Sequence, residues 1–267
     1  MGIIWGLFIV AYFPAAQVLV IQWAELEEYT HAFLTVPIIG YMVWLKRATL
    51  QKQQNSLQQI IAMVILTLST LLYMVAAKLH IPSIINLTLI ISLLSILLYF
   101  VSFNSLRGLT TPILLTIMLV PIPTQIYSMI TVPLQLKVSE MSSFLMYLLN
   151  VPIFREGNII NIPGKTFQVI DACSGMRYII SIATLSLLFG YFTLHKNISK
   201  IILLLFAVPI AFLVNVIRVM TQVMAFHFFK IDWSTDTAHT VMGTIVFGLA
   251  ILALFFLQRI LEFWEQK

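Results

Sequence analysis

One stretch of the chain, Val169-Ile-Asp-Ala-Cys-Ser-Gly-Met-Arg177, separates a polar, turn-rich segment from a long apolar one. It contains Cys173, the only cysteine among 267 residues. A thiol at a helix start is acidified by the helix dipole and by nearby cations, which favours the nucleophilic thiolate. A free cysteine is also commonly a small buried apolar residue. The stretch therefore raises the hypothesis that Cys173 is a nucleophile, and the remaining sequence must decide between the two interpretations.

The composition places the chain in a membrane. Apolar residues make up 60% of it and charged residues 9%, and the mean hydropathy is +1.00. Because helices satisfy their own backbone hydrogen bonds in lipid, this composition predicts an all-α integral membrane protein. No linker or repeat divides the sequence, so we expect a single transmembrane domain over residues 1–267. One cysteine excludes an internal disulfide, and we predict no metal and no cofactor. The net charge of +5 does not indicate nucleic-acid binding, since the placement of charges matters more than their sum here.

Eight apolar segments predict membrane spans, for which about 20 residues are needed, or somewhat fewer when the flanks snorkel. The first is expected to be a retained span, because a basic n-region and a small-residue cleavage site are lacking. The predicted spans are residues 3–22, 32–45, 59–77, 81–103, 109–127, 173–194, 201–223 and 238–257. The fifth is expected to be broken near its end by Pro121 and Pro123.

Two further elements are expected outside these spans. Residues 128–150 carry Lys137 and Glu140 at their centre, three residues apart and so on one helical face. An isolated charge at mid-bilayer costs about 2.5–3.5 kcal/mol, so we interpret this segment as an amphipathic helix in the membrane interface, entered at Pro133. A tilted span is the alternative. Alternating residues on both sides of Pro163-Gly164 predict a small β-hairpin over residues 158–162 and 166–170 outside the bilayer.

The distribution of basic residues predicts the orientation. With both termini cytoplasmic and residues 128–150 outside the bilayer core, the basic residues near span ends face the cytoplasm, as the positive-inside rule requires. These residues are Lys46, Arg47, Lys52, Arg107, Lys196, Lys200, Arg259 and Lys267. The same orientation places Cys173 at the extracytoplasmic face.

Three separate spans then bring a cysteine, an arginine and a histidine to that face. Arg218 lies near the outer end of the seventh span and His239 starts the eighth. His239 can act as base toward the Cys173 thiol and return the proton to a leaving amine. Arg218 can stabilise an oxyanion, to which the backbone N–H groups of Ser174 and Gly175 can also donate. Such a trio performs acyl transfer through a thioester.

A second group of residues is expected to support the trio or to bind substrate. Asn215 lies one turn before Arg218 and can orient it, or only join two helices by a hydrogen bond. Arg177 lies one turn after Cys173 and can bind substrate or a lipid phosphate. Asp171 and His31 complete the group. Alternative roles remain for two members of the trio. Arg218 could snorkel to the lipid headgroups, and His239 could be an interfacial or helix-capping group.

An ordered set of short motifs from Trp23 to Phe247 resembles the exosortase/archaeosortase family of membrane-embedded cysteine transpeptidases. Asp171 stands where that family often has Glu, and Ala32 stands where Gly often follows the histidine. The motifs are Tyr29-Thr-His31, Pro121-Ile-Pro123, Pro133-Leu-Gln135, Arg155-Glu-Gly157, Ala172-Cys-Ser-Gly175, Asn215-Val-Ile-Arg218, and His239 with Gly243 and Phe247.

The resemblance implies a function and a location. Cys173, Arg218 and His239 match the residues taken as that family's catalytic set. The implied substrates are exported proteins that end in a tripartite sorting signal: a short motif such as PEP, a transmembrane helix and a basic tail. The implied location is the cell (inner) membrane of a bacterium or archaeon, in contact with lipid and not with nucleic acid. A small-molecule transporter or a non-catalytic membrane assembly factor is the alternative. A transporter predicts ionisable groups at mid-membrane and two related halves with broken helices, and the sequence shows no such repeat.

Overall fold

The computed structural model of the protein describes residues 2–50, 55–169, 176–231 and 236–266, with the side chains of residues 2–5, 176, 177 and 236–240 left out. The described chain is mostly helical and divides into two compact units, Met1–Pro123 and Thr124–Lys267. The division falls after Pro121 and Pro123, two closely spaced prolines that remove two backbone N–H donors and disfavour helical backbone at Val120 and Ile122.

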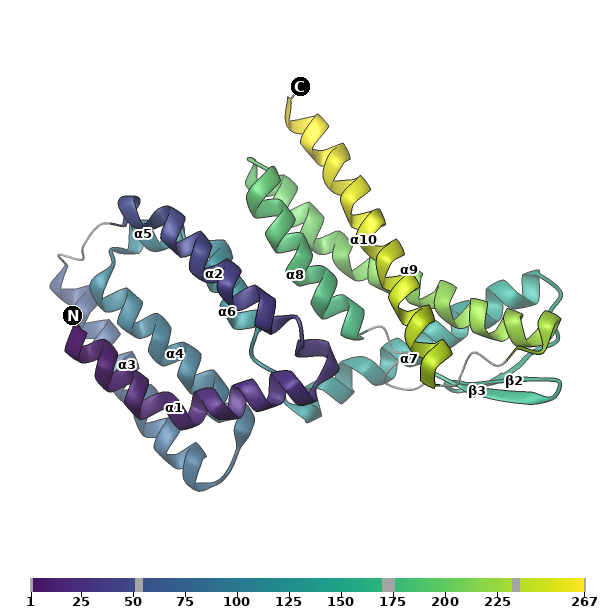
Figure 1. The fold of residues 1–267 in the computed structure, drawn as a ribbon, viewed down its shortest axis with the longest axis horizontal. Coiled ribbons are helices and arrows are strands. Elements are labelled where there is room, and N and C mark those ends of the chain that lie inside the picture. Colours follow the sequence, from purple (N-terminus) through teal and green to yellow (C-terminus); the bar gives the residue numbers. More distant parts are fainter. Residues whose placement is uncertain (1, 51–54, 170–175, 232–235, 267) are drawn as a thin grey trace. The chain divides into compact units, whose positions relative to one another are not determined.

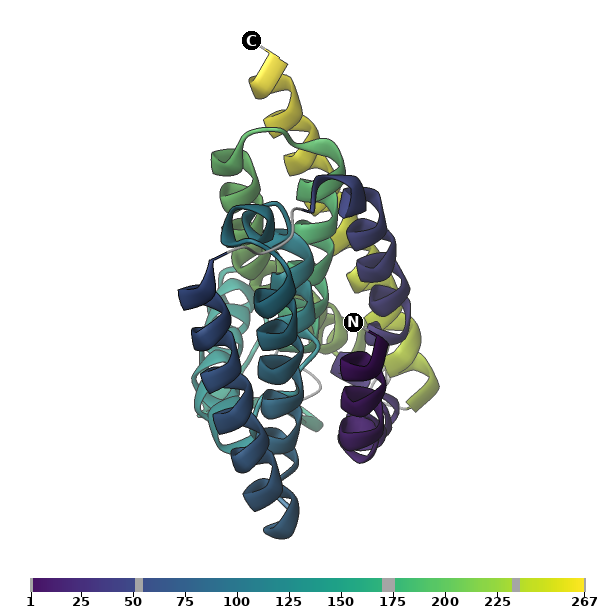
Figure 2. The same cartoon turned by 90° about the vertical axis from the view of Figure 1, so that its left-hand side faces the viewer.

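The first unit is a bundle of helices (Figures 1 and 2). α3 and α4 pack side by side, α1 packs against α4, and α2 packs against α6. Its elements are α1 (Gly2–Glu25), the 3₁₀ turn η1 (Glu27–Tyr29), α2 (Ala32–Lys46), the 3₁₀ turn η2 (Arg47–Thr49), α3 (Ser56–Lys78), α4 (Pro82–Phe100), α5 (Phe103–Arg107) and α6 (Thr110–Met118).

Hydroxyl groups join three of these helices inside an apolar bundle. Tyr12 of α1 lies 2.6 Å from the Ser92 Oγ of α4, and that hydroxyl donates to Ser69 of α3 at 2.9 Å. The Ser69 hydroxyl donates in turn to the Thr88 carbonyl of α4 at 3.0 Å. Each hydroxyl in this chain is therefore satisfied within the bundle, which is how polar groups hold helices together where there is no water.

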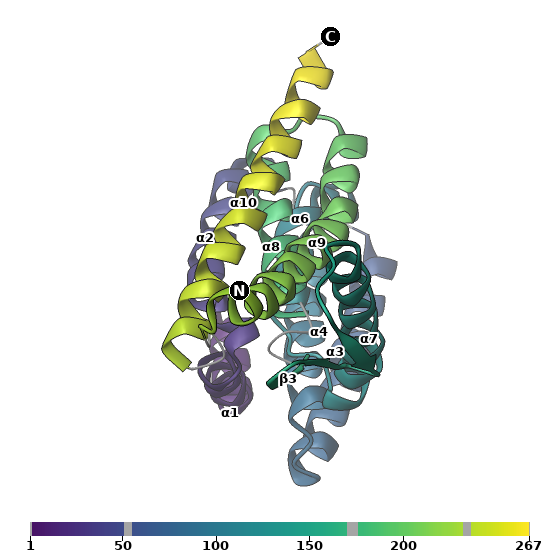
Figure 3. The same ribbon diagram turned by 90° about the vertical axis from the view of Figure 1, so that its right-hand side faces the viewer.

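The second unit contains every residue predicted for catalysis and packs three long helices side by side (Figures 1 and 3). α8 and α10 both contact α9. α8 comes directly before α9 in the chain and α10 directly after it, each joined by a short connection, so both run antiparallel to α9. α7 packs along α9 and against the strands. The elements are α7 (Thr124–Leu148), β1 (Phe154–Glu156), β2 (Ile159–Ile162), β3 (Lys165–Gln168), α8 (Met176–Thr193), α9 (Asn197–Phe229) and α10 (Asp236–Gln266).

The predicted hairpin is confirmed, and a third strand joins it. β2 and β3 pair antiparallel around the Pro163-Gly164 turn, where Gly164 adopts φ +90°, a conformation that glycine tolerates best. The sheet order is β1-β2-β3. One face of the sheet buries Ile160 and Phe167 against Val219 of α9. This packing fixes the end of β3, from which the chain continues toward Cys173.

The eight predicted spans are not confirmed as a set. Five helices in the described part are long and apolar enough to cross a membrane: α1, α3, α4, α9 and α10. α8 is a shorter apolar helix over Tyr178–Thr193, and α2 has 15 residues. The fifth predicted span is represented by α6, which has only nine residues, because the chain meets Pro121 and Pro123 soon after Met118. The described helices are therefore those of a multi-pass membrane protein, and they confirm five spanning helices of the eight that the sequence predicts.

α7 covers the segment that was interpreted as an interfacial helix. It is one helix of 25 residues with Pro133 inside it, and it is not among the candidate spans. The Lys137 ammonium donates to the Glu140 carboxylate at 2.9 Å, and both side chains are exposed. This ion pair holds the pKa of Glu140 below its ordinary value. The interfacial position itself stays a prediction.

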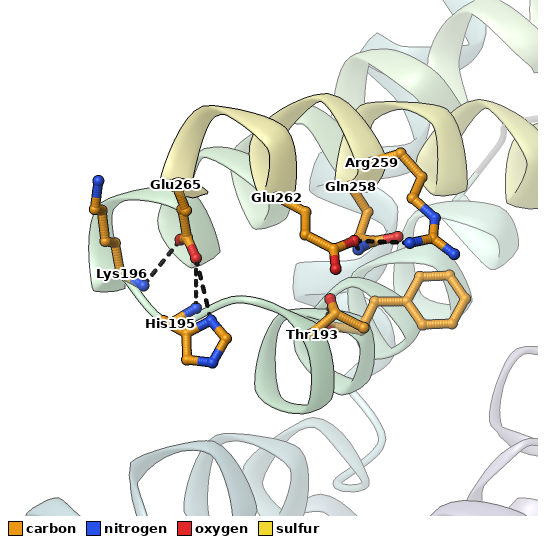
Figure 4. A network of polar contacts seen from close by, with 8 residues as sticks. Thr193, His195, Lys196, Gln258, Arg259, Glu262 and Glu265 are labelled. Carbon is orange, nitrogen blue, oxygen red and sulfur yellow. Dashed lines mark hydrogen bonds and ion pairs between the residues drawn. The ribbon is translucent and has the colours of Figure 1, made fainter. Parts of the chain in front are cut away.

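The ends of three helices of the second unit meet at one carboxylate (Figure 4). The two oxygens of Glu265, near the end of α10, accept the backbone N–H groups of His195 and Lys196 at 2.7 and 2.8 Å. These residues connect α8 to α9, and Lys196 caps α9 without a side-chain hydrogen bond of its own. The carboxylate therefore takes the place of a capping side chain at the start of α9.

We expect Glu265→Ala to lower the thermal unfolding midpoint of the protein in membrane mimetics. Hydrogen bonds to a charged group contribute about 1.5–3 kcal/mol each, and the removed carboxylate also faces the positive end of a helix dipole. The matched control is Glu262→Ala, one turn earlier, which removes an ion pair with Arg259 and a hydrogen bond from Gln258 Nε2, both within α10 (Figure 4). Exposed ion pairs are worth about 0–1 kcal/mol, and neither contact joins α10 to another helix. Equal midpoints for the two variants would show that the Glu265 contacts do not hold the three helices.

Candidate active site

The predicted site residues fall into three groups. Asp171, Cys173, Ser174 and Gly175 lie outside the described residues. Arg177 and His239 belong to α8 and α10 as backbone only. Asn215, Arg218 and His31 are described in full, and the first two lie in α9. The geometry of the site is therefore built from Arg218 outward.

Arg218 is buried inside the second unit and does not snorkel. Its side chain is only 1% exposed, and Arg218 is the largest side chain among the fully buried ones. The Nη1 group donates to the Tyr178 hydroxyl at 2.9 Å, and the guanidinium carbon lies 5.7 Å from the centre of the Tyr178 ring. A buried cation is costly and is retained mainly where it has a function, so this placement marks a candidate site.

Gly243 of α10 makes room for this arginine and its tyrosine partner. A Cβ added at Gly243 would lie 3.2 Å from the Tyr178 hydroxyl oxygen and 3.6 Å from Arg218 Nη2. One turn later, the Phe247 ring stacks on the Tyr178 ring with 6.0 Å between centroids. Tyr178 is therefore clamped between α9 and α10, and it presents its hydroxyl to Arg218 at the junction of three helices.

The sequence neighbours of this cluster are the predicted nucleophile and base. His239 lies four residues before Gly243 in α10, on the same helical face, and so about 6 Å further along the axis. Cys173 precedes Tyr178 by five residues, in the stretch that leads into α8. Because α10 runs antiparallel to α9, the backbone of His239 lies beyond Gly243 in the direction in which α9 ends. The structure thus brings the His239 end of α10 and the start of α8 to the Arg218 part of α9, while Cys173 itself lies outside the described residues.

Asn215 shares the burial of Arg218. It is fully buried one turn earlier on α9, and the adjacent Val216 carbonyl accepts a hydrogen bond from Ser142 of α7 at 3.5 Å. Asn215 therefore lies where α7 and α9 pack together. Its predicted role in orienting Arg218 stays a prediction, as do the predicted roles of Asp171 and Arg177.

His31 lies in the first unit, at the start of α2. Burial lowers the pKa of His31 below its ordinary value, and a hydrogen bond with the backbone of Glu28 acts against this shift. Its ring stacks near the Tyr29 ring at 6.4 Å, and the Tyr29 hydroxyl accepts the Ile122 N–H at 3.0 Å. Two of the motifs noted in the sequence, Tyr29-Thr-His31 and Pro121-Ile-Pro123, are therefore structural neighbours. A catalytic role for His31 stays a prediction.

A polar cleft of about 340 Å³ opens beside the strand that leads to Cys173. The first half of α7 forms one wall with Thr131 and Gln135, and Asn158 and Gln168 come from the hairpin. The lining residues in the described part are hydroxyl, amide and apolar side chains without a charge. Such a lining suits the N–H and C=O groups of an uncharged peptide segment.

Tyr178 is the site residue that the sequence analysis missed. A tyrosine in an apolar helix needs a partner for its hydroxyl, which is a usable signal. In the sequence it directly follows Arg177 and comes five residues after Cys173, but only the packing of α8 against α9 shows that Arg218 is the partner.

Comparison with known proteins gives one result that covers most of the chain. The family model described as transmembrane exosortase (Exosortase_EpsH) matches residues 23–256. Curated proteins and solved structures gave no match. The matched range includes the whole Arg218 cluster and both flanking positions, Cys173 and His239. The chain belongs to the transmembrane exosortase family.

Proposed function

We propose that this protein is a cysteine-dependent sorting protease and transpeptidase of the membrane. The buried Arg218, held by Tyr178 against Gly243, is the observation that carries this proposal. A fixed cation and a hydroxyl at the junction of α8, α9 and α10 support this proposal, because Cys173 shortly precedes α8 in the sequence and His239 belongs to the first turn of α10. Family membership supports the same class of activity.

The proposed reaction passes through a thioester. His239 accepts the proton of the Cys173 thiol, and the sulfur attacks the carbonyl carbon of the scissile peptide bond. Arg218 stabilises the negative oxygen that forms, because its guanidinium stays protonated and is already held in place. The C–N bond then breaks, and His239 returns its proton to the leaving amine. An acceptor nucleophile attacks the resulting thioester and restores the thiol.

The proposed substrates are exported proteins whose C-terminal signal combines a short motif, a transmembrane helix and a basic tail. Such a helix would dock laterally in the bilayer and present its outer juxtamembrane peptide to Cys173. The uncharged cleft beside β3 would accept an adjoining stretch of extended peptide. With both termini cytoplasmic, this site faces the extracytoplasmic side of the cell membrane.

The experiment that tests this function follows substrate processing in membranes that contain the enzyme and a reporter protein with such a tripartite signal. Wild-type protein is expected to convert the reporter to a shorter or acceptor-linked form, and Cys173→Ala is expected to leave it uncut. Processing that continues in Cys173→Ala would show that the cysteine is not the nucleophile. Biological function that survives Cys173→Ala, Arg218→Ala and His239→Ala combined would favour an assembly factor instead.

A methyl group at Gly243 is expected to slow processing about tenfold, since a 1 Å misplacement in an active site costs about 10²-fold. Gly243→Ala would push the Tyr178 hydroxyl or the Arg218 guanidinium by a few tenths of an ångström from where they now lie. Gly248→Ala is the matched control on the same helix, because a Cβ there meets no described atom within 4 Å. Initial rates of reporter cleavage check the prediction, and equal rates for the two variants would contradict it.

A further inference from the structure

A second polar side chain of α9 is buried close to Arg218. Gln222 is 7% exposed, and its amide nitrogen Nε2 has no hydrogen-bond partner among the described residues. A buried donor without a partner costs about 1–3 kcal/mol, so native proteins rarely retain one without a use. Neither the sequence motifs nor the proposed catalytic trio assigns a role to this residue.

The position of Gln222 connects it with the proposed site. It follows Arg218 by four residues and therefore lies on the same face of α9, about 6 Å closer to the end of the helix. His239 precedes Gly243 by four residues on α10. Because α10 runs antiparallel to α9, His239 is shifted from Gly243 toward the end of α9, just as Gln222 is shifted from Arg218. Gln222 and His239 thus stand at the same level of the helix bundle.

Two described residues that flank the Cys173 stretch in the sequence lie against this part of α9. Val169 belongs to the same buried apolar cluster as Val219 and Val223. Tyr178 accepts a hydrogen bond from Arg218. Cys173 lies between these two residues in the sequence and outside the described part of the chain.

We propose that Gln222 is a substrate-binding residue of this site, whose amide N–H donates to a backbone carbonyl of the peptide being cleaved. This inference rests on the proposed function. In an extended peptide, carbonyls that point to the same side are two residues apart, or about 6.6 Å. Arg218 and Gln222 lie on one helix face with their backbones about 6 Å apart along the axis, close to this spacing, so one can hold the scissile carbonyl and the other the carbonyl two residues away. A neutral amide suits this task because it binds a carbonyl without a preference for side-chain charge.

The test is Gln222→Met, which keeps the volume and removes the donor. We expect cleavage of the tripartite reporter to slow about tenfold or more, as for the loss of a donor that acts on the reacting peptide. We also expect the thermal midpoint to stay equal or to rise, since replacement of an unsatisfied buried amide by an apolar group is neutral or stabilising. Ser143→Ala is the matched control. Its hydroxyl on α7 is likewise buried without a partner among the described residues, but it lies outside the Arg218 face.

The outcomes separate this inference from the function on which it rests. Slower cleavage by Gln222→Met with an unchanged midpoint, and wild-type rates for Ser143→Ala, would establish the role. Cleavage by Gln222→Met at the wild-type rate would overturn it. A slower cleavage rate accompanied by a lower thermal unfolding midpoint would also overturn it, because it would show that Gln222 contributes only to packing. Both results leave the function intact if the wild type cleaves and Cys173→Ala does not. Cleavage by Cys173→Ala would overturn the function and this inference together.

Discussion

An Arg218→Lys variant is expected to insert and fold, but to cleave the tripartite reporter about 10²–10³-fold more slowly, which is the usual cost of losing one oxyanion donor. Lysine keeps the charge, yet it presents a single point of donation in place of a planar fork. The arginine now donates through Nη1 to Tyr178 while Nη2 lies beside Gly243, and lysine cannot reproduce both contacts. The measurement is the time course of precursor and product at equal enzyme level.

Arg259→Lys provides the control for this substitution. Arg259 lies on α10, and its guanidinium pairs with Glu262 at the exposed surface (Figure 4). It follows Gly243 by 16 residues on that helix, which is about 24 Å along the axis. The same chemical change there should leave the rate unaltered. If Arg218→Lys cleaved as fast as Arg259→Lys, a role for the Arg218 fork in the reaction would be excluded.

A His239→Gln variant is expected to lose about 10²–10⁴-fold in rate, because removal of a positioned general acid–base costs that much. Glutamine can still hydrogen-bond to the thiol, but it cannot carry the proton from sulfur to the leaving amine. The loss should shrink when the substrate is a peptide thioester or activated ester, whose leaving group needs no proton. Rates on the amide and ester forms of one substrate provide the measurement.

His195→Gln is the matched control for the histidine. His195 lies between α8 and α9 with an exposed side chain, at the Glu265 end of the unit (Figure 4). The replacement should change neither the amide nor the ester cleavage rate. The hydrogen bond from His195 to Glu265 is donated by the backbone N–H, which glutamine retains. An equal loss of amide and ester cleavage in His239→Gln would show that the histidine does not serve as the proton carrier.

The parts of the fold that follow from local chemistry were predictable. Pro163-Gly164 between two alternating stretches predicts the hairpin, and the structure confirms it as β2 and β3. β1 was missed because its three residues are all exposed and show no alternation. The length of the fifth span was overestimated because apolar residues continue past Met118, while the closely spaced Pro121 and Pro123 disfavour helical backbone at and before both positions. Hydropathy reports how apolar a segment is, but not whether its backbone can stay helical.

The candidate site was predictable only in outline. The order of Cys173, Arg218 and His239 along three apolar segments indicates that they converge, but it cannot show that Arg218 is buried. A terminal arginine that snorkels and a buried one have the same local sequence. The Tyr178 partner, the room made at Gly243 and the position of Gln222 depend on how α8 and α10 register against α9. Glu265 is a similar case, since in the sequence it is one more acidic residue of a polar tail, whereas in the structure it joins three helix ends.

The central claim is that Cys173 forms a covalent thioester with the substrate. The most direct measurement mixes wild-type enzyme with the tripartite reporter, stops the reaction with acid, and identifies by mass spectrometry the enzyme peptide that contains Cys173. We predict that this peptide carries the acyl portion of the cleaved reporter and that hydroxylamine removes it. Continued formation of product with Cys173 unmodified at every time point, or with the acyl group on a different residue, would contradict the claim.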